Sequence, residues 1–131
     1  MIAVDTNVLV RILIDDSGAA VQMQAARALL ANAEVLYVPQ IVQVETVWVL
    51  ESAYGFDKSA ICKILDHLLL HPQFLLQSAE IFNSAVTLFR KHSADFSDCL
   101  ILTEAMTQNL QLYTFDKKLG RIKGAASPSY S

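Results

Sequence analysis

The sequence predicts an α/β fold, a three-layer α/β/α sandwich in which helices cover both faces of a central parallel sheet of four to five strands. Short, almost continuously apolar runs alternate with longer segments whose apolar residues recur every three or four positions. These are the patterns of buried parallel strands and of amphipathic helices. Hydrophobic residues make up 53% of the 131 positions and charged residues only 18%, so we expect a single domain, 1–131, with a substantial core.

The order of the predicted elements follows from this alternation. Apolar runs predict strands at 1–4, 35–38, 74–77 and 110–115. Helical spacing predicts six helices, near 8–13, 17–29, 39–54, 57–70, 78–89 and 98–108. Pro39 favours a helix start, whereas Asp57 and Ser78 are suited to cap helix N-termini. The tail 124–131 is small and polar and predicts a weak edge element or a frayed end.

Composition excludes several classes of protein. A net charge of -3 argues against binding nucleic acid through a global positive field, although a local basic patch remains possible. Cys62 and Cys99 have no metal-ligand spacing, which favours buried thiols in a reducing compartment. The apolar start carries Asp5 and Arg11 and is unlike a signal peptide, and no run is long enough to span a bilayer. We therefore expect a cytoplasmic protein with no membrane partner.

Acidic residues occupy the positions where a parallel sheet binds its ligands. Asp5 directly follows the first predicted strand and Asp116 the last. Because such sites lie beyond the carboxyl ends of the strands, both carboxylates are expected at one rim. Asp98, with Asp95 nearby, leads into a helix, and Glu45 interrupts an otherwise apolar one. We expect Asp5, Glu45, Asp98 and Asp116 to share one cleft.

Converging carboxylates repel one another and raise one another's pKa, so a cation is expected to neutralise them. Oxygen-only ligands suit Mg²⁺ or Mn²⁺. Such an ion can bind phosphate oxygens and activate a water molecule for phosphodiester hydrolysis.

Each acid also has a structural interpretation, which the sequence leaves open. Asp5-Thr6-Asn7 can be a strand-to-helix turn with an N-cap, and Asp95 or Asp98 can cap the following helix. Asp116 can open a turn, and Glu45 can be a solvated helix residue.

Other chemistries fit less well. His67 and His71 are four positions apart but lack the His-Glu-x-x-His frame of a zinc site. The four glycines form no phosphate-binding loop. Ser97 and Cys99 lack a nearby histidine and a nucleophile elbow.

Four segments together resemble PIN-domain ribonucleases, most closely the VapC-type toxins of type II toxin-antitoxin systems. No segment is specific alone, but their order and spacing match along essentially the whole chain. The segments are Asp5-Thr6-Asn7, Val44-Glu45-Thr46, Asp95-Phe96-Ser97-Asp98-Cys99-Leu100-Ile101 and Tyr113-Thr114-Phe115-Asp116-Lys117-Lys118-Leu119.

The resemblance implies a Mg²⁺- or Mn²⁺-dependent endoribonuclease with a five-stranded parallel sheet. It assigns the catalytic, metal-binding roles to Asp5, Glu45, Asp98 and Asp116. It assigns supporting roles to four further residues, of which the first two support Asp5: Thr6, Asn7, Asp95 and Thr114. The last strand of the family is hard to find in the short tail after Gly124.

The resemblance also implies an RNA substrate and a cognate antitoxin that covers the acidic site. The third predicted helix is apolar on nearly every side, through residues such as Trp48 and Val49, so part of it is expected to meet the antitoxin or a second copy in a homodimer. A central position in the core is the alternative. Four basic residues after Asp116 are candidates for RNA phosphate binding, or form a solvated turn: Lys117, Lys118, Arg121 and Lys123.

Two other functions compete with a ribonuclease. One is a non-catalytic PIN-like scaffold that binds RNA or protein. The other is a haloacid-dehalogenase-like phosphatase, which places a second acid two residues after the first, where this sequence has Asn7.

Overall fold

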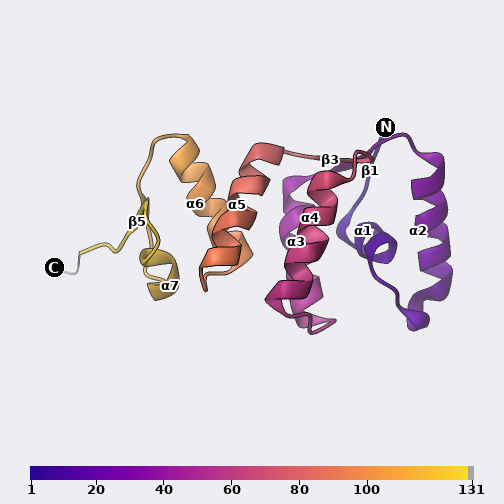
Figure 1. The fold of residues 1–131 in the computed structure, drawn as a ribbon, viewed down its shortest axis with the longest axis horizontal. Coiled ribbons are helices and arrows are strands. Elements are labelled where there is room, and N and C mark those ends of the chain that lie inside the picture. The colour runs from indigo at the N-terminus through magenta and orange to yellow at the C-terminus, as the bar shows by residue number, and fades with distance from the viewer. Residues whose placement is uncertain (130–131) are drawn as a thin grey trace. The chain divides into compact units, whose positions relative to one another are not determined.

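The computed structural model describes residues 1–129, which divide into two compact units, Met1–Ala79 and a second from Glu80 onward (Figure 1). The expected alternation of strands and helices is confirmed. The predicted α/β class with parallel strands is confirmed, and the largest sheet is somewhat smaller than expected: the five described strands form one parallel sheet of three and one of two. A single domain over the whole chain stays a prediction.

The first unit contains a three-stranded sheet with β2 in its centre. The strands are β1 (Ile2–Ala3), β2 (Leu36–Val38) and β3 (Phe74–Leu76), in the order β1-β2-β3. Ile2 is in register with Leu36, and Leu36 with Phe74. All three strands therefore end at the same edge, and Asp5 lies two residues beyond the end of β1.

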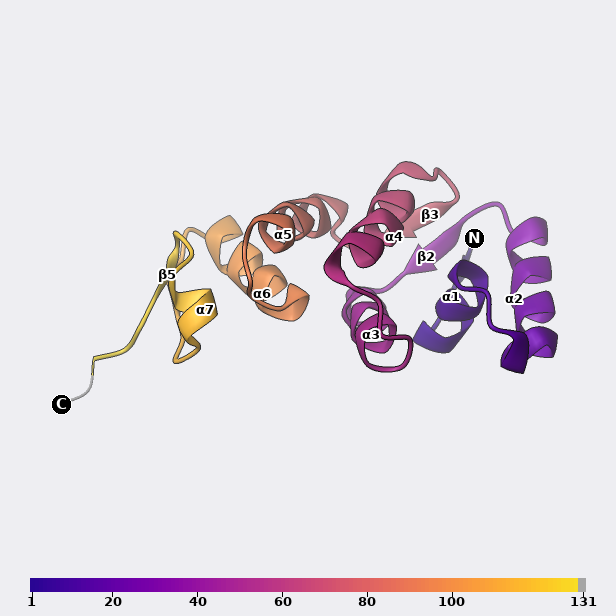
Figure 2. The ribbon, with the colours of Figure 1, turned by 60° about the horizontal axis from the view of Figure 1, so that its bottom comes forward.

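Four α-helices and one 3-10 turn complete this unit: α1 (Thr6–Leu13), η1 (Ser17–Ala19), α2 (Ala20–Asn32), α3 (Gln40–Ser52) and α4 (Lys58–Leu70). Figure 2 shows α1 beside α2, and α3 beside α4. The expected cap at Asp57 is confirmed, because its carboxylate accepts a hydrogen bond from the Ala60 N–H at 2.9 Å. Leu9, Leu36 and Leu65 are fully buried in the core.

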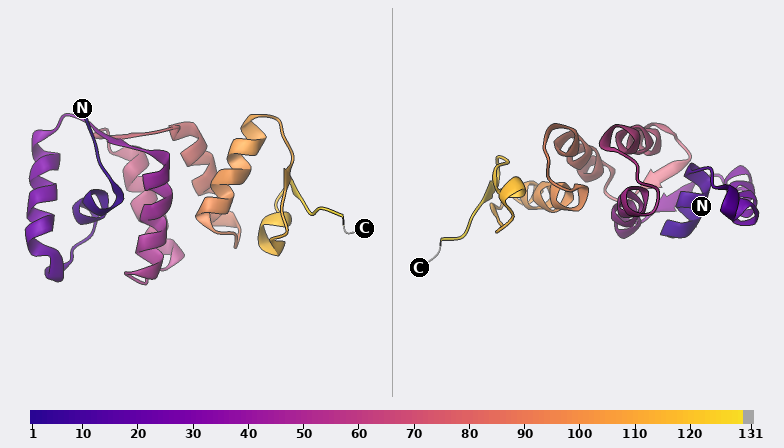
Figure 3. Two further views of the ribbon diagram at one scale, coloured as in Figure 1. Left: turned by 180° about the vertical axis from the view of Figure 1, so that it is seen from behind. Right: turned by 90° about the horizontal axis from the view of Figure 1, so that it is seen from below.

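The second unit places two longer helices side by side, α5 (Ala79–Lys91) and α6 (Phe96–Thr107) (Figure 3). The buried ring of Phe96 packs edge-on against Phe82 and Phe89, with ring centroids 5.7 and 5.8 Å apart. This contact fixes the first turn of α6, where Asp98 lies. The helix begins two residues before the predicted start, because the first helical residue is the buried Phe96.

A two-stranded parallel sheet and a short helix follow: β4 (Leu112–Tyr113), α7 (Lys117–Gly120) and β5 (Ala125–Ala126). The tail thus forms the weak edge strand that its composition allows, with residues 130 and 131 outside the described part. Gly124 has a φ of 103°, and a Cβ there would approach the Met106 sulfur to 2.9 Å. Only glycine fits at this point, where the chain passes close to α6 and enters β5. No helix within 1–129 combines the length and hydrophobicity that a membrane crossing needs.

Candidate active site

The first two candidate acids lie in the first unit, close to the carboxyl ends of its strands. Asp5 follows β1 and caps α1, because its Oδ1 accepts a hydrogen bond from the Val8 N–H at 3.0 Å. Its other carboxylate oxygen makes no hydrogen bond within the described chain. The capping interpretation is therefore correct for Asp5, yet a cap uses only part of an exposed carboxylate.

Glu45 lies on α3 and is linked to the turn that follows Asp5. The Thr6 hydroxyl donates a hydrogen bond to Glu45 Oε1 at 3.0 Å. The resemblance assigns Thr6 to the support of Asp5, but in the structure its side chain orients Glu45. Thr6 is the residue next to Asp5, so one short segment positions both acids.

The exposed face of α3 on which Glu45 lies also carries large apolar side chains. Ile41 is 65% exposed and Trp48 67%, and these positions are four residues before Glu45 and three after it. Residues with this spacing lie on one side of a helix. Val42, Val47 and Leu50 are buried instead, so α3 has both a core side and an apolar outer side.

In the second unit, Asp98 feels the charges of two other candidate acids, Asp116 and Asp95. Burial raises the pKa of the Asp98 carboxyl above its ordinary value, and the negative charges of Asp116 and Asp95 raise it further. Asp98 lies in the first turn of α6, where a helix N-terminus favours negative charge.

Asp95 and Asp116 have different local roles. Asp95 is at the N-cap position of α6, but its side chain makes no capping hydrogen bond. Asp116 caps α7 through a bond of 2.8 Å from the Leu119 N–H. The Thr114 hydroxyl accepts a bond from the Asp116 N–H at 3.0 Å, so Thr114 shapes the turn that presents this acid.

The four basic candidates follow Asp116 in the same unit. All of them are exposed and none makes an ion pair with another described residue: Lys117, Lys118, Arg121 and Lys123. Their ammonium and guanidinium groups are therefore available to a phosphate backbone.

Within neither unit do three or more His, Cys, Asp or Glu side chains of the described residues come together as a metal-binding group. Each unit carries two of the four principal acids. Their convergence in one cleft stays a prediction.

The donor chemistry nevertheless fits a hard divalent cation. Every candidate ligand is a carboxylate. The pKa of Asp98 is raised first by burial and then by the charges of Asp116 and Asp95, which a cation would neutralise. The candidate ligands include no histidine or cysteine. Carboxylate ligands alone favour Mg²⁺ or Mn²⁺ over Zn²⁺.

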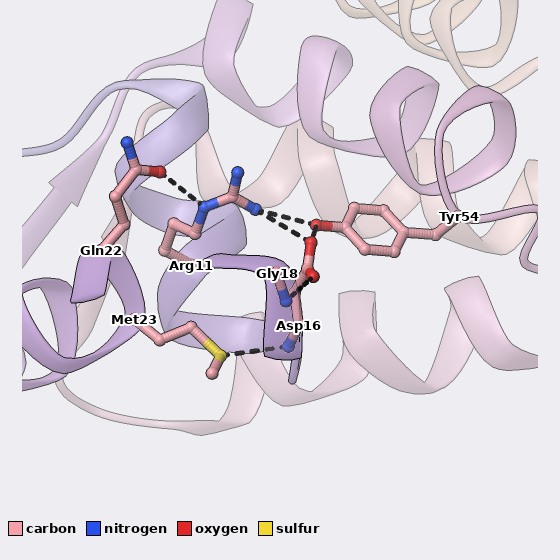
Figure 4. A network of polar contacts seen from close by, with 6 residues as sticks. All are labelled: Arg11, Asp16, Gly18, Gln22, Met23 and Tyr54. Carbon is pink, nitrogen blue, oxygen red and sulfur yellow. Dashed lines mark hydrogen bonds and ion pairs between the residues drawn. The ribbon is translucent and has the colours of Figure 1, made fainter. Parts of the chain in front are cut away.

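A polar network that sequence reasoning did not identify joins α1, η1 and α2 to Tyr54 in the turn after α3 (Figure 4). The Arg11 guanidinium donates to the Tyr54 hydroxyl at 2.8 Å, and that hydroxyl donates to Asp16 at 2.9 Å. Arg11 also donates to Gln22 on α2 at 2.9 Å. The sequence feature that could have indicated this network is Arg11, a charged residue between the apolar positions of a short helix.

Comparison with known proteins identifies relatives of the chain. The family model described as PIN domain matches residues 2–125. A protein of Aquifex aeolicus (strain VF5) described as VapC ribonuclease is 24% identical over 90 residues, which cover 68% of this chain and 67% of that protein. A solved structure described as a toxin-antitoxin complex from Klebsiella pneumoniae aligns with a TM-score of 0.37 and 21% identity, over 98% of this chain and 97% of that chain.

Proposed function

The chain belongs to the PIN domain family, and from this premise we propose that it is a divalent-cation-dependent endoribonuclease that acts as the toxin of a toxin-antitoxin pair. The observation that carries the proposal is the agreement between the family match over residues 2–125 and the acids at the motif positions. The similarity to a VapC ribonuclease supports RNA as the substrate class.

In the proposed site, Asp5, Glu45, Asp98 and Asp116 hold Mg²⁺ or Mn²⁺. When bound, such an ion acts as a Lewis acid that stabilises charge developing on the phosphate and makes water a better nucleophile. Thr6 holds the Glu45 carboxylate in place, and Thr114 holds the turn at Asp116. Lys117, Lys118, Arg121 and Lys123 bind phosphates of the RNA.

Cleavage of RNA is expected to need a divalent cation and to leave 5′-phosphate and 3′-hydroxyl ends. Attack by water produces these ends, whereas attack by the ribose 2′-hydroxyl produces 2′,3′-cyclic phosphates. The measurement is incubation with single-stranded RNA after chelation, then with Mg²⁺ or Mn²⁺ restored, followed by end-group analysis. A purified protein that binds RNA but never cuts it would instead be the scaffold alternative, and cyclic phosphate products would contradict hydrolysis by water.

We propose that the antitoxin docks on the exposed side of α3. Ile41 and Trp48 flank Glu45 on that side, so a partner that buries them also covers a metal-binding acid. Exposed apolar side chains of this size are typical of interaction surfaces. A homodimer through the same side is the second occupant that the test distinguishes.

Trp48→Ala is expected to weaken partner association by roughly tenfold to a thousandfold, because buried tryptophans at interfaces contribute about 2 kcal/mol or more. Trp48 is 67% exposed in the chain alone, so the fold should remain cooperative. The measurements are antitoxin affinity by calorimetry and chain mass by light scattering. Leu70→Ala, at an 82% exposed position on α4, is the matched control. Unchanged affinity and unchanged mass would show that α3 is not the interface.

A further inference from the structure

A pocket of about 430 Å³ lies in the first unit, beside Thr6, the residue that follows Asp5 and hydrogen-bonds to Glu45. Its volume is within the range of about 300 to 1,000 Å³ that is typical of small-molecule sites. Eight residues line it: Thr6, Asn7, Val10, Arg11, Asp16, Val49, Ala53 and Tyr54. We name it the α1/α3 pocket.

The pocket lies next to two of the candidate metal-binding acids, to which it is linked through Thr6. Thr6 is one of the lining residues and directly follows Asp5 in the chain. Its hydroxyl donates a hydrogen bond to the Glu45 carboxylate at 3.0 Å. A substrate phosphate held at these acids would therefore place the adjoining nucleotide at the mouth of the pocket.

Tyr54 supplies a rigid aromatic surface in the pocket. Its hydroxyl accepts a hydrogen bond from Arg11 and donates one to Asp16, at 2.8 and 2.9 Å (Figure 4). These bonds use the polar end of the side chain, and the ring packs at a tilt against Phe56 with centroids 5.9 Å apart. The part of the ring that lines the pocket is therefore what a ligand can contact. Unpaired bases of RNA stack on aromatic side chains held in this way.

The charge of the pocket favours a base over a phosphate. Arg11 is the only cationic lining residue, and its Nη1 lies 3.6 Å from the Asp16 carboxylate, which neutralises it. A phosphate would bring its negative charge next to Asp16 and close to Glu45. A neutral, flat group meets no such repulsion.

Asn7 adds a means of reading the edge of a base. Its side chain is exposed and has no hydrogen-bond partner among residues 1–129. An amide offers both donors and an acceptor, which can match the hydrogen-bonding edge of a nucleobase. Val10 and Val49 contribute apolar surface beside it.

We propose that the α1/α3 pocket binds one unpaired nucleobase of the RNA strand, next to the phosphodiester that is cut, with the Tyr54 ring as stacking surface and Asn7 as hydrogen-bonding partner. The proposal rests on the proposed function and extends it to single-stranded RNA. Arg11 and Asp16 also line the pocket, and their hydrogen bonds to the Tyr54 hydroxyl hold its ring in place.

Ala53→Phe tests the pocket by filling it. Ala53 lines the pocket, is exposed and follows the end of α3, so a larger side chain there should not disturb the core. Ala28→Phe is the matched control, because it adds the same group to an exposed position on α2 outside the lining residues. Tyr54→Ala is the second variant and removes the stacking surface.

The probe is a single-stranded oligoribonucleotide in which one abasic ribonucleotide is moved along the sequence. With the wild type, one position beside the cut is expected to lower kcat/KM at least tenfold when its base is removed. With Ala53→Phe and Tyr54→Ala, the intact RNA is cut at least tenfold less efficiently, and base removal at that position changes kcat/KM less than twofold. Ala28→Phe should behave as the wild type.

The pocket does not hold a base if every abasic position affects Ala53→Phe and the wild type equally, even where Ala53→Phe is less active. The same series, measured as binding to an Asp98→Asn protein by fluorescence anisotropy, separates this result from failure of the proposed function. RNA that binds with the expected base dependence but is never cut by the wild type supports the pocket and contradicts the ribonuclease. Binding without any base dependence contradicts the pocket alone.

Discussion

Replacing Asp5 with asparagine is expected to lower RNA cleavage by at least about a hundredfold while leaving the free energy of unfolding nearly unchanged. Cation stabilisation of transition-state charge is worth several kcal/mol, and each 1.4 kcal/mol or so corresponds to a factor of ten in rate. Asparagine keeps an oxygen at the same place but removes the negative charge that binds the ion.

The structural role of Asp5 makes this substitution sharper than an alanine substitution. Asp5 caps α1 by accepting from the Val8 N–H, and asparagine caps a helix about as well as aspartate. Asp5→Ala loses the cap as well, at a cost of about 1 kcal/mol in stability. A loss of activity in Asp5→Ala alone therefore cannot distinguish chemistry from folding, whereas a loss in Asp5→Asn can.

Initial rates with saturating Mg²⁺ and urea unfolding curves of both variants provide the measurement. Asp57→Asn is the control, because Asp57 caps α4 in the same way and is not among the acids at the motif positions. Cleavage by Asp5→Asn at the wild-type rate would remove Asp5 from the metal site.

Local patterns predicted the six longer helices and the caps at Asp5 and Asp57, because these features depend on neighbouring residues, but they did not predict the short helix α7. The apolar spacing from Ile61 to Leu68 predicts α4, and both residues are buried. The last strands were harder, because Ala125 and Ala126 carry no strand pattern and β5 forms only where Gly124 lets the chain approach α6. The strand predicted at 110–115 is confined to Leu112–Tyr113.

The sequence predicts which acids belong to the candidate site, but not which residues hydrogen-bond to one another there. Acids that follow strands can be found in the sequence, as Asp5 and Asp116 were. The bond from Thr6 to Glu45 joins residues 39 positions apart, and the bond from Arg11 to Tyr54 joins residues 43 apart. Such pairs are set by how α1 packs against α3, which no local pattern encodes.

Asp98→Asn is expected to have opposite effects with and without the cation. The pKa of Asp98 is raised in the folded protein by burial and by the charges of Asp116 and Asp95. A carboxyl group with a raised folded-state pKa binds protons more tightly when folded, so stability falls as pH increases above the ordinary value of 3.8. At pH 7 the charged group therefore destabilises the metal-free fold.

Asparagine removes this charge, so metal-free Asp98→Asn should be more stable than the wild type at pH 7. The gain should be below about 1 kcal/mol, because Asp98 is only partly buried and solvent screens its neighbours. It should shrink as the pH is lowered toward 3.8, where the wild-type carboxyl is protonated.

Saturating Mg²⁺ or Mn²⁺ should reverse the order. A ligand at a hundred times its Kd stabilises the folded state by about 2.7 kcal/mol, which exceeds the gain from removing the charge. The wild type should then unfold at the higher Tm, and the variant, lacking one ligand, should respond weakly to the ion. Calorimetric scans at pH 7 with chelator and with each ion measure both effects, with Glu104→Gln on the same helix as the control. Equal Tm increases of the wild type and Asp98→Asn on adding the ion would place Asp98 outside the metal site. Relief of carboxylate repulsion alone would change the Tm without the ion but not the response to the ion.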